Sequence, residues 1–472
     1  MTNSSRWWLR VAVVFAMAVQ SSPVSAAADG TPLRVQVFHS PPFTLSPGSV
    51  EDRFYSDIAF PRGHIALKSL NAEVVDEAGK PVPLYETYIH HWLLVRFYQR
   101  KRSGATSPPP EPPESLFTGN AASSSNGPPE YILAGNSGTC GGILPQTFGL
   151  GSETRRTATW VPDPYGIEVG NPAEVPTGYE EKWMLNVHAI DTRGSVDRLG
   201  CTECRCELYN VTVDERGRPL VKDYVGGLVC CHDKARCRTG VGSGGAPRKL
   251  FLRYEVKWLD WAADIVPVKV YILDVTDDGK SGSKPSTDDL NSNGCRVEYM
   301  VAPCGREAAA AGGACIDSKR VDLVLPRGGD IVYAVAHQHT GGVGVALYGQ
   351  DGRTLCSSTP IYGGGKEAGD EVGYIVGMTT CYPSPGSVKV TAGERVALVS
   401  NYNATELHTG VMGLFYFLLA DPPASTVRLT GGMLNSNYWW VLLVIGITVA
   451  SAVAVLYRRS RARDQRYRSL LM

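Results

Sequence analysis

Histidines in strand-like segments are the residues of this sequence best suited to metal chemistry. His337 and His339 follow a mostly apolar run over 330–336 and stand just before a pair of glycines. Residues two apart in a β-strand project from the same face, so these two imidazoles would lie side by side at a strand end. Neutral imidazole is a ligand for copper, zinc, iron and nickel. Taken alone, the motif fits a pair of half-buried structural histidines equally well.

Other strand-like segments hold three more histidines and a methionine. His90 and His91 are adjacent, His188 lies in a second segment, and Met412 lies in a third. Neighbours in a regular strand face opposite ways, so His90 and His91 reach one ion only if the strand bulges or the rings use different nitrogens. A methionine in a strand is more often core filling than a ligand.

The remaining histidines are interpreted as structural or solvent-exposed, namely His39, His64, His232 and His408. His408 stands four residues before Met412 and is the alternative ligand to test. Asn186, two residues before His188, would share its strand face. It either orients substrate or water or has a plain surface role.

Composition indicates a turn-rich β protein rather than a nucleic-acid-binding one. The 46 basic and 46 acidic residues give a formal net charge of +0, so no overall field draws the chain to nucleic acid. The 51 glycines and 31 prolines separate short alternating runs such as 33–38, 64–70 and 88–97. These runs predict an all-β fold of sandwiches or barrels, in a chain long enough for two domains.

The expected domains are separated by polar or low-complexity stretches. Residues 27–275 form the first domain, with a Pro/Ser-rich insertion at 102–129 and a Cys-rich insertion at 201–247. Residues 276–420 form the second domain, and its polar start marks the boundary.

Both ends carry targeting signals. Residues 1–26 have the basic, apolar and small-residue regions of a signal peptide. A stalk at 421–437 leads to an uncharged run at 438–457 that is long enough for a transmembrane helix, and the basic tail 458–472 follows. The positive-inside rule places this tail in the cytoplasm. We expect a single-pass type I protein of the secretory pathway, at the plasma membrane or an endomembrane, with its ectodomain extracellular or lumenal.

Twelve cysteines, an even number, predict disulfides in an oxidising compartment. Six of them lie between Cys201 and Cys237. A zinc knuckle using these thiolates with His232 is the alternative, but an exported chain favours disulfides. Asn210 and Asn403 are potential glycosylation acceptors.

The order of the metal-binding residues resembles that of a known family. The order is His-His, His, His-x-His and Met. It is similar to the order in the copper type II, ascorbate-dependent monooxygenases, the family of peptidylglycine α-hydroxylating monooxygenase and dopamine β-hydroxylase. The phrases at 38–43, 88–94 and 336–342 make the whole exported region resemble the plant stress up-regulated Nod nineteen family, a stress-response family. The monooxygenase resemblance implies two jelly-roll-like β-sandwich domains that face each other across a wet cleft, with one copper on each.

Carried onto this sequence, the resemblance implies two copper sites and a substrate-site residue. His90, His91 and His188 would hold the electron-accepting copper. His337, His339 and Met412 would hold the oxygen-binding copper, and Tyr416 would lie near the substrate. Ascorbate would reduce both ions, and O2 would be used to hydroxylate a C–H bond. A thioether beside two imidazoles favours Cu(I), which agrees with an O2-binding role.

Departures from the monooxygenase pattern narrow the expected substrate. The family binds a peptide carboxylate with an Arg and an Asn, and Val335 and Leu414 stand at those positions here. Without the Arg the charge-assisted clamp is lost, so peptide amidation is not expected. Gly413 replaces a family cysteine, and the resemblance leaves Cys356 and Cys381 as one disulfide pair.

We therefore expect a membrane-anchored copper protein that hydroxylates an unidentified small-molecule or wall-associated substrate. A non-catalytic cell-surface binding or structural protein on the same scaffold is the alternative, because the lost clamp and the insertions fit it as well. Copper storage or redox sensing is a third hypothesis.

Overall fold

The computed structural model describes residues 32–56, 58–102, 128–137, 140, 144–214, 217–220, 227, 229–242, 244–277, 295–305 and 315–421. These residues form one compact unit that ends at Asp421. Strands dominate it, and the described helical turns are the short α1 (Arg198–Thr202), η2 (Ser152–Arg156) and η3 (Cys206–Leu208). The predicted all-β class is therefore confirmed.

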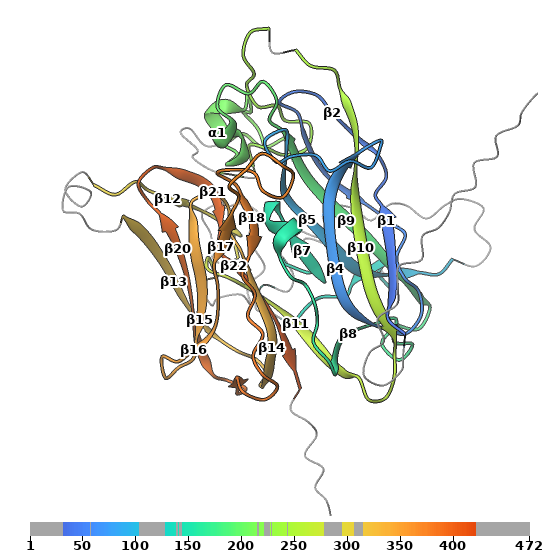
Figure 1. The fold of residues 1–472 in the computed structure, drawn as a ribbon. Helices are drawn as coiled ribbons and strands as arrows, with labels where there is room; N and C mark the ends of the chain where they lie inside the picture. The colour runs from blue at the N-terminus through green and yellow to red at the C-terminus, as the bar shows by residue number, and fades with distance from the viewer. Residues whose placement is uncertain are drawn as a thin grey trace, which may run out of the picture. The chain divides into compact units, whose positions relative to one another are not determined.

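The largest sheet joins strands from both halves of the chain (Figure 1). Its order is β1 (Arg34–His39), β10 (Arg248–Asp260), β4 (Ile65–Asp76), β8 (Tyr165–Val169), β11 (Val266–Asp274), β22 (Leu414–Ala420), β14 (Gly329–His337) and β19 (Lys389–Val390), with β2 (Phe43–Leu45) also on β10. β11 pairs with β22 from Val268↔Ala420 to Asp274↔Leu414. Hydrogen bonds thus cross the boundary expected near residue 276, and each strand covers an edge that the other would leave open.

A second sheet carries the first group of histidines. Its order is β3 (Val50–Tyr55), β9 (Tyr179–Asp191), β5 (Thr87–Arg100) and β6 (Tyr131–Leu133), with β7 (Phe148–Leu150) also on β5. The long antiparallel pair β5 and β9 runs from Thr87↔Asp191 to Arg100↔Tyr179. Trp92, at 0% exposure, is among the largest side chains that anchor β5 in the core.

The remaining C-terminal strands form three smaller sheets. The four-stranded sheet contains β13 (Ile316–Val324), β20 (Arg395–Asn403), β15 (Gly342–Tyr348) and β16 (Thr354–Ser358). The two-stranded sheets pair β12 (Glu298–Val301) with β21 (His408–Met412), and β17 (Pro360–Tyr362) with β18 (Ile375–Met378).

The strand that ends in His337 is buried along its whole length. All nine residues of β14 are buried, since strands flank it on either side and core packs on both its faces. A strand covered on both faces reads as a continuous apolar run rather than an alternating one. This is why the run 331–336 is apolar throughout, and why His337 emerges at a rigid strand end.

Six disulfides account for all twelve cysteines, and none is free. They join Cys140–Cys295, Cys201–Cys237, Cys204–Cys231, Cys206–Cys230, Cys304–Cys315 and Cys356–Cys381. The disulfide interpretation of the Cys-rich insertion and the pair Cys356–Cys381 are confirmed. Such a framework is typical of an oxidising, secretory-type compartment.

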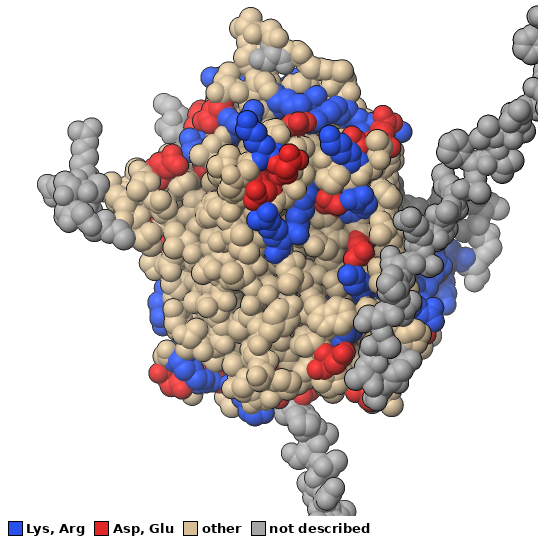
Figure 2. All heavy atoms as spheres, in the orientation of Figure 1, with Lys and Arg blue, Asp and Glu red and all other residues tan. Residues whose placement is uncertain are grey.

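Several expected segments lie outside the described residues. These are the signal peptide 1–26, most of the insertion 102–129, and the stalk, transmembrane helix and tail beyond Asp421. Within the described part of the chain, no helix has the length and apolar character needed to cross a membrane. Figure 2 shows lysines and arginines interspersed with acidic residues on the visible face of the protein.

Candidate metal centre

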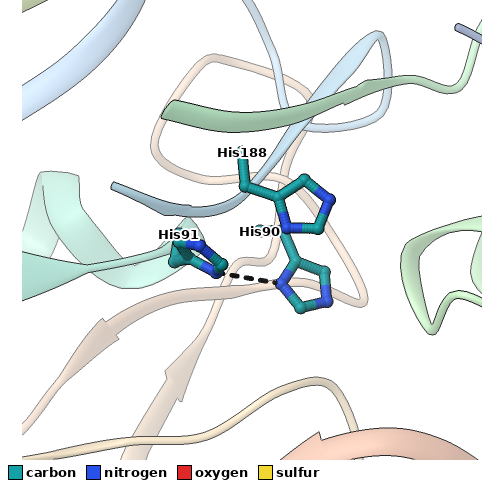
Figure 3. A group of neighbouring side chains, drawn as sticks. All are labelled: His90, His91 and His188. Atoms are coloured by element: carbon teal, nitrogen blue, oxygen red, sulfur yellow. Dashed lines mark hydrogen bonds between the residues drawn. The ribbon is translucent and has the colours of Figure 1, made fainter. Parts of the chain in front are cut away.

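A β-bulge brings the first three histidines together. The register of β5 against β9 shifts between Ile89 and His91, so His90 is the extra residue of a bulge. One ring nitrogen each of His90, His91 and His188 then lies within 4.8 Å of the others. Figure 3 shows the three rings gathered at one place, with Nδ1 of His90 and Nδ1 of His91 3.4 Å apart. The bulge is the condition under which both neighbours can serve one ion.

The second group lies at the ends of β14 and β21. His337 is the last residue of β14, and the rings of His337 and His339 have centroids 5.1 Å apart. Gln338 between them donates its amide to Ser400 Oγ at 3.0 Å, on the other side of the chain, as the alternation predicts. Met412 ends β21 and lines a cavity together with His337.

The two groups are in direct contact with each other. The ring centroids of His90 and His339 lie 4.3 Å apart, and those of His90 and His188 lie 4.5 Å apart. Four of the rings are buried, with exposures of 0% for His90 and His188, 1% for His339 and 9% for His337. The resemblance implies two groups on either side of a wet cleft, whereas these five imidazoles form one cluster in which four rings are buried and His91 is half-buried.

Hydrogen bonds to one nitrogen of three rings leave the other nitrogen free. His188 donates from Nε2 to the Cys231 carbonyl at 3.0 Å, and His339 donates from Nδ1 to the Gly410 carbonyl at 2.9 Å. His337 Nδ1 lies 2.6 Å from Glu153 Oε1. The remaining nitrogens of these rings, and His90 Nε2, are buried with no partner among the described residues.

Unpartnered buried nitrogens are costly unless a ligand satisfies them. A buried acceptor without a hydrogen bond costs about 1–3 kcal/mol, and here four such atoms lie in one cluster. Metal-binding histidines commonly donate their second N–H to a carboxylate or a carbonyl, which fixes the tautomer. The residues present therefore fit a metal ion.

Burial keeps His90, His91, His188 and His339 in the neutral form that metal binding needs. It lowers the pKa of His91 and of His188 to about 3. The pKa values of His90 and His339 are also held well below the ordinary value, by burial first and by neighbouring imidazoles second. A neutral imidazole has a lone pair ready for a metal without prior loss of a proton.

Glu153 is a supporting residue that sequence reasoning missed. It lies in η2, is 0% exposed, and reaches His337 from 184 positions away in the chain. Its second oxygen, Oε2, has no partner in the described structure. A single glutamate in an irregular segment carries no motif, so no sequence signal identified it.

The Cys-rich insertion forms one wall of the cluster. The sulfurs of Cys204 and Cys231 lie within 4.8 Å of a ring nitrogen of His90, and the Cys231 carbonyl orients His188. These sulfurs are bonded to each other, so they are not thiolate ligands. The insertion thus positions imidazoles rather than supplying ligands.

His408 has a different partner from the one its spacing suggested. Its Nδ1 lies 2.6 Å from Glu203 Oε1, and both side chains are almost fully buried. Burial opposes the charged form, but the hydrogen bond and the charge of Glu203 outweigh it and raise the pKa of His408. The structural interpretation of His408 is therefore favoured over the ligand one.

Three other histidines lie outside the cluster, and Asn186 differs from its expected surface role. His39 is exposed, His64 Nε2 lies 2.7 Å from Glu168, and His232 donates to the Asp233 carbonyl. Asn186 is only 1% exposed and donates to Asp52 Oδ1 at 3.0 Å. A surface role for Asn186 is therefore wrong.

A cavity of about 180 Å³ adjoins the cluster. His91, His337, Met412 and Tyr416 are among the residues that line it. Tyr416 donates its hydroxyl to the Thr147 carbonyl at 3.0 Å and stacks on Phe148, so its ring serves as a wall.

A comparison with models of known protein families identifies the family of this chain. The family model described as stress up-regulated Nod 19 matches residues 31–422. The chain belongs to the stress up-regulated Nod 19 family. The expected membership is therefore confirmed over nearly all of the described Nod 19 chain.

Comparisons with curated sequences and with solved structures identify no further relative of known fold or function. No curated protein matches the Nod 19 chain in sequence. The VP2 subviral particle of infectious bursal disease virus is 10% identical over 84% of this chain and 75% of that one, with a TM-score of 0.15. The structure of the Gt strain of the same virus is 9% identical over 86% and 84%, with a TM-score of 0.11. Such scores establish no shared fold.

Proposed function

We propose that this Nod 19 protein binds copper through its buried histidine cluster. The observation that carries the proposal is the set of four buried ring nitrogens without a partner in the described chain. The ligand residues would be His90, His91, His188, His337, His339 and Met412. Imidazoles suit several metals, but a thioether added to an imidazole set favours Cu(I), and the cluster offers no free thiolate.

The activity we propose is ascorbate-dependent hydroxylation of a substrate C–H bond by O2. Bound copper would supply the chemistry of O2 activation, with ascorbate as the reductant. The chain's own residues would hold the substrate in the cavity beside His337 and Met412, keep water from it, and orient His337 through Glu153. Tyr416 would position the substrate with its ring. Peptide amidation is not proposed, because Val335 and Leu414 line the cavity where a charged clamp would be needed.

A non-catalytic role is the second candidate, and the contact between the two groups favours it. His90 and His339 are in ring contact inside the protein instead of on opposite sides of an open cleft. Such a buried cluster suits copper storage, redox sensing or a structural, stress-related role at the cell surface.

We also propose two jelly-roll-like lobes and a type I anchor. The two lobes would correspond to strands before and after residue 276, joined through β11 and β22. The anchor is supported by the uncharged run 438–457 and the arginines that follow it.

Copper content tests the metal proposal. The full chain, made through a secretory pathway with copper present, is compared with His188→Ala, His339→Ala and Met412→Leu. We expect about two copper ions per chain, with a loss of at least one in each histidine variant. Met412→Leu is expected to weaken Cu(I) binding more than Cu(II) binding, because the soft thioether is lost.

Matched controls are the exposed histidine His39→Ala and the buried methionine Met378→Leu, which is 1% exposed and outside the cluster. Both should keep the copper content of the parent chain. A chain that folds but takes up no copper would sink the metal proposal. Copper without ascorbate-dependent O2 consumption, for any of a panel of substrates, would favour the storage role.

A further inference from the structure

The cavity beside the histidine cluster has uncharged walls. Leu93, Leu144, Leu150 and Ile272 are among the apolar residues that line it. Among the described residues that line it, there is no lysine, arginine, aspartate or glutamate. An ionised group buried without a partner is strongly unfavourable. The walls therefore exclude carboxylate and ammonium ligands.

The volume fits one ring. The cavity measures about 180 Å³. Apolar protein cavities of roughly 150 Å³ stay dry and accept a benzene-sized molecule. A single aromatic or aliphatic ring with a short substituent therefore matches the volume of the cavity.

The polar groups of the wall offer a ligand no open anchor. The Tyr416 hydroxyl already donates to Thr147. Gln146 Oε1 and His337 Nε2 have no hydrogen-bond partner in the described structure, but both atoms are buried below the accessible surface. A ligand in the cavity is therefore held by apolar contacts.

We propose that this cavity binds a small neutral ring compound through apolar contacts. If the proposed function holds, this compound class is the substrate, since His337 and Met412 also line the cavity. Binding itself needs only the cavity, so it is independent of the metal.

Binding to the metal-free full chain tests the proposal. After treatment with a chelator, the chain is titrated calorimetrically with 4-methylphenol, toluene, benzoate and benzylammonium. We expect saturable binding of toluene, weaker binding of 4-methylphenol because its hydroxyl gives up hydrogen bonds to water, and no binding of the two ions. Tighter binding of either ion than of toluene overturns the proposal, and so does the absence of binding by both neutral probes.

Variants test whether the probes occupy the cavity. Ile272→Phe should abolish binding of both neutral probes by filling the cavity, and Leu414→Phe provides a second filling variant in case the first misfolds. Gln99→Leu, at a buried residue outside the cavity, should leave both affinities unchanged. Unchanged affinities in a folded filling variant would contradict the assigned site.

Copper content measured in parallel distinguishes the two proposals. Probe binding by a chain that takes up no copper would leave the cavity assignment standing and sink the proposed function. Copper uptake by a chain that binds no neutral probe would overturn the cavity assignment and leave the copper proposal standing.

Discussion

At the scale of single residues, the centre depends on which nitrogen of each ring is left free. Glu153, the Cys231 carbonyl and the Gly410 carbonyl each hold one N–H of a histidine. This fixes the tautomer and leaves the other nitrogen available to a ligand. The supporting groups are thus as much a part of the centre as the imidazoles.

Replacing the carboxylate that holds His337 should weaken copper binding. In Glu153→Gln the amide oxygen can still accept the hydrogen bond, but the carboxylate–histidine pair that supports a metal ligand is lost. We expect an affinity for copper that is lower by roughly tenfold to a hundredfold. Competition with a colorimetric Cu(I) chelator measures it.

The matched control is Glu168→Gln, which alters a histidine–carboxylate pair outside the cluster. Its copper affinity should equal that of the parent chain. Equal affinities for Glu153→Gln and Glu168→Gln would show that Glu153 does not support the centre.

Sequence spacing predicted the histidines but not their partners. His-His, His and His-x-His stand in apolar runs and are visible as motifs. Glu153 is an isolated residue in an irregular segment, and its role arises from a contact over a long sequence separation. The pairing of His408 with Glu203, 205 positions away, was hidden for the same reason.

At the scale of elements, close packing of the backbone sets the position of the β5 bulge. A Cβ at Gly151, between β7 and η2, would meet the His90 carbonyl at 2.4 Å and His337 Cε1 at 2.8 Å. Gly151 therefore keeps β5 and the end of β14 close together. The adjacent histidines alone indicated that β5 needs a bulge for both to serve one ion. The position of the bulge was not predictable, because it depends on how β5 pairs with β9.

Gly151→Ala should disturb both stability and copper binding. The added methyl group must push the bulge away from His337, and we expect a loss of about 1–3 kcal/mol of unfolding free energy together with weaker copper binding. Urea unfolding and copper competition measure the two effects. Gly244→Ala, whose Cβ would meet nothing within 4 Å, should change neither. If Gly151→Ala matched Gly244→Ala in both unfolding free energy and copper affinity, this packing would be contradicted.

The buried pair His408–Glu203 joins β21 to the residue that caps α1. The pKa of His408 is raised in the folded chain, so its contribution to stability is complete below the unfolded value of about 6.5. The contribution is lost as the pH rises through the folded pKa. Glu203 also pairs with Arg205, and Glu406 adds to the field at His408.

His408→Gln should therefore cost about 2 kcal/mol at pH 6 and less at pH 8.5. Urea unfolding of parent and variant at each pH measures the difference, in which the pH effects of the other histidines cancel. His64→Gln removes a partly exposed pair with Glu168 and should cost less than about 1 kcal/mol. A His408→Gln effect that grows with pH would refute this assignment.

At the scale of the whole molecule, one sheet unites segments that the sequence appeared to separate. The polar stretch after residue 276 has the composition of a linker, and this suggested a domain boundary. The pairing of β11 with β22 and the disulfide Cys140–Cys295 tie the two sides together. Alternation and turn residues predicted strands, but which strands pair over such distances depends on tertiary packing that no local pattern encodes.

The shared sheet predicts a single cooperative unfolding transition for the disulfide-intact chain up to Asp421. Near-UV circular dichroism and tryptophan fluorescence should give coincident urea transitions, because unfolding either side exposes the edge of the other. Two separated transitions would show that the sides fold independently.

The central claim is that the buried histidine cluster holds copper, and anomalous diffraction at the copper edge tests it most directly. For crystals of the copper-loaded chain, the account predicts an anomalous peak about 2 Å from ring nitrogens of His90, His188, His337 or His339. A loaded, folded crystal with no peak in this cluster, or with copper only on the surface, would contradict it.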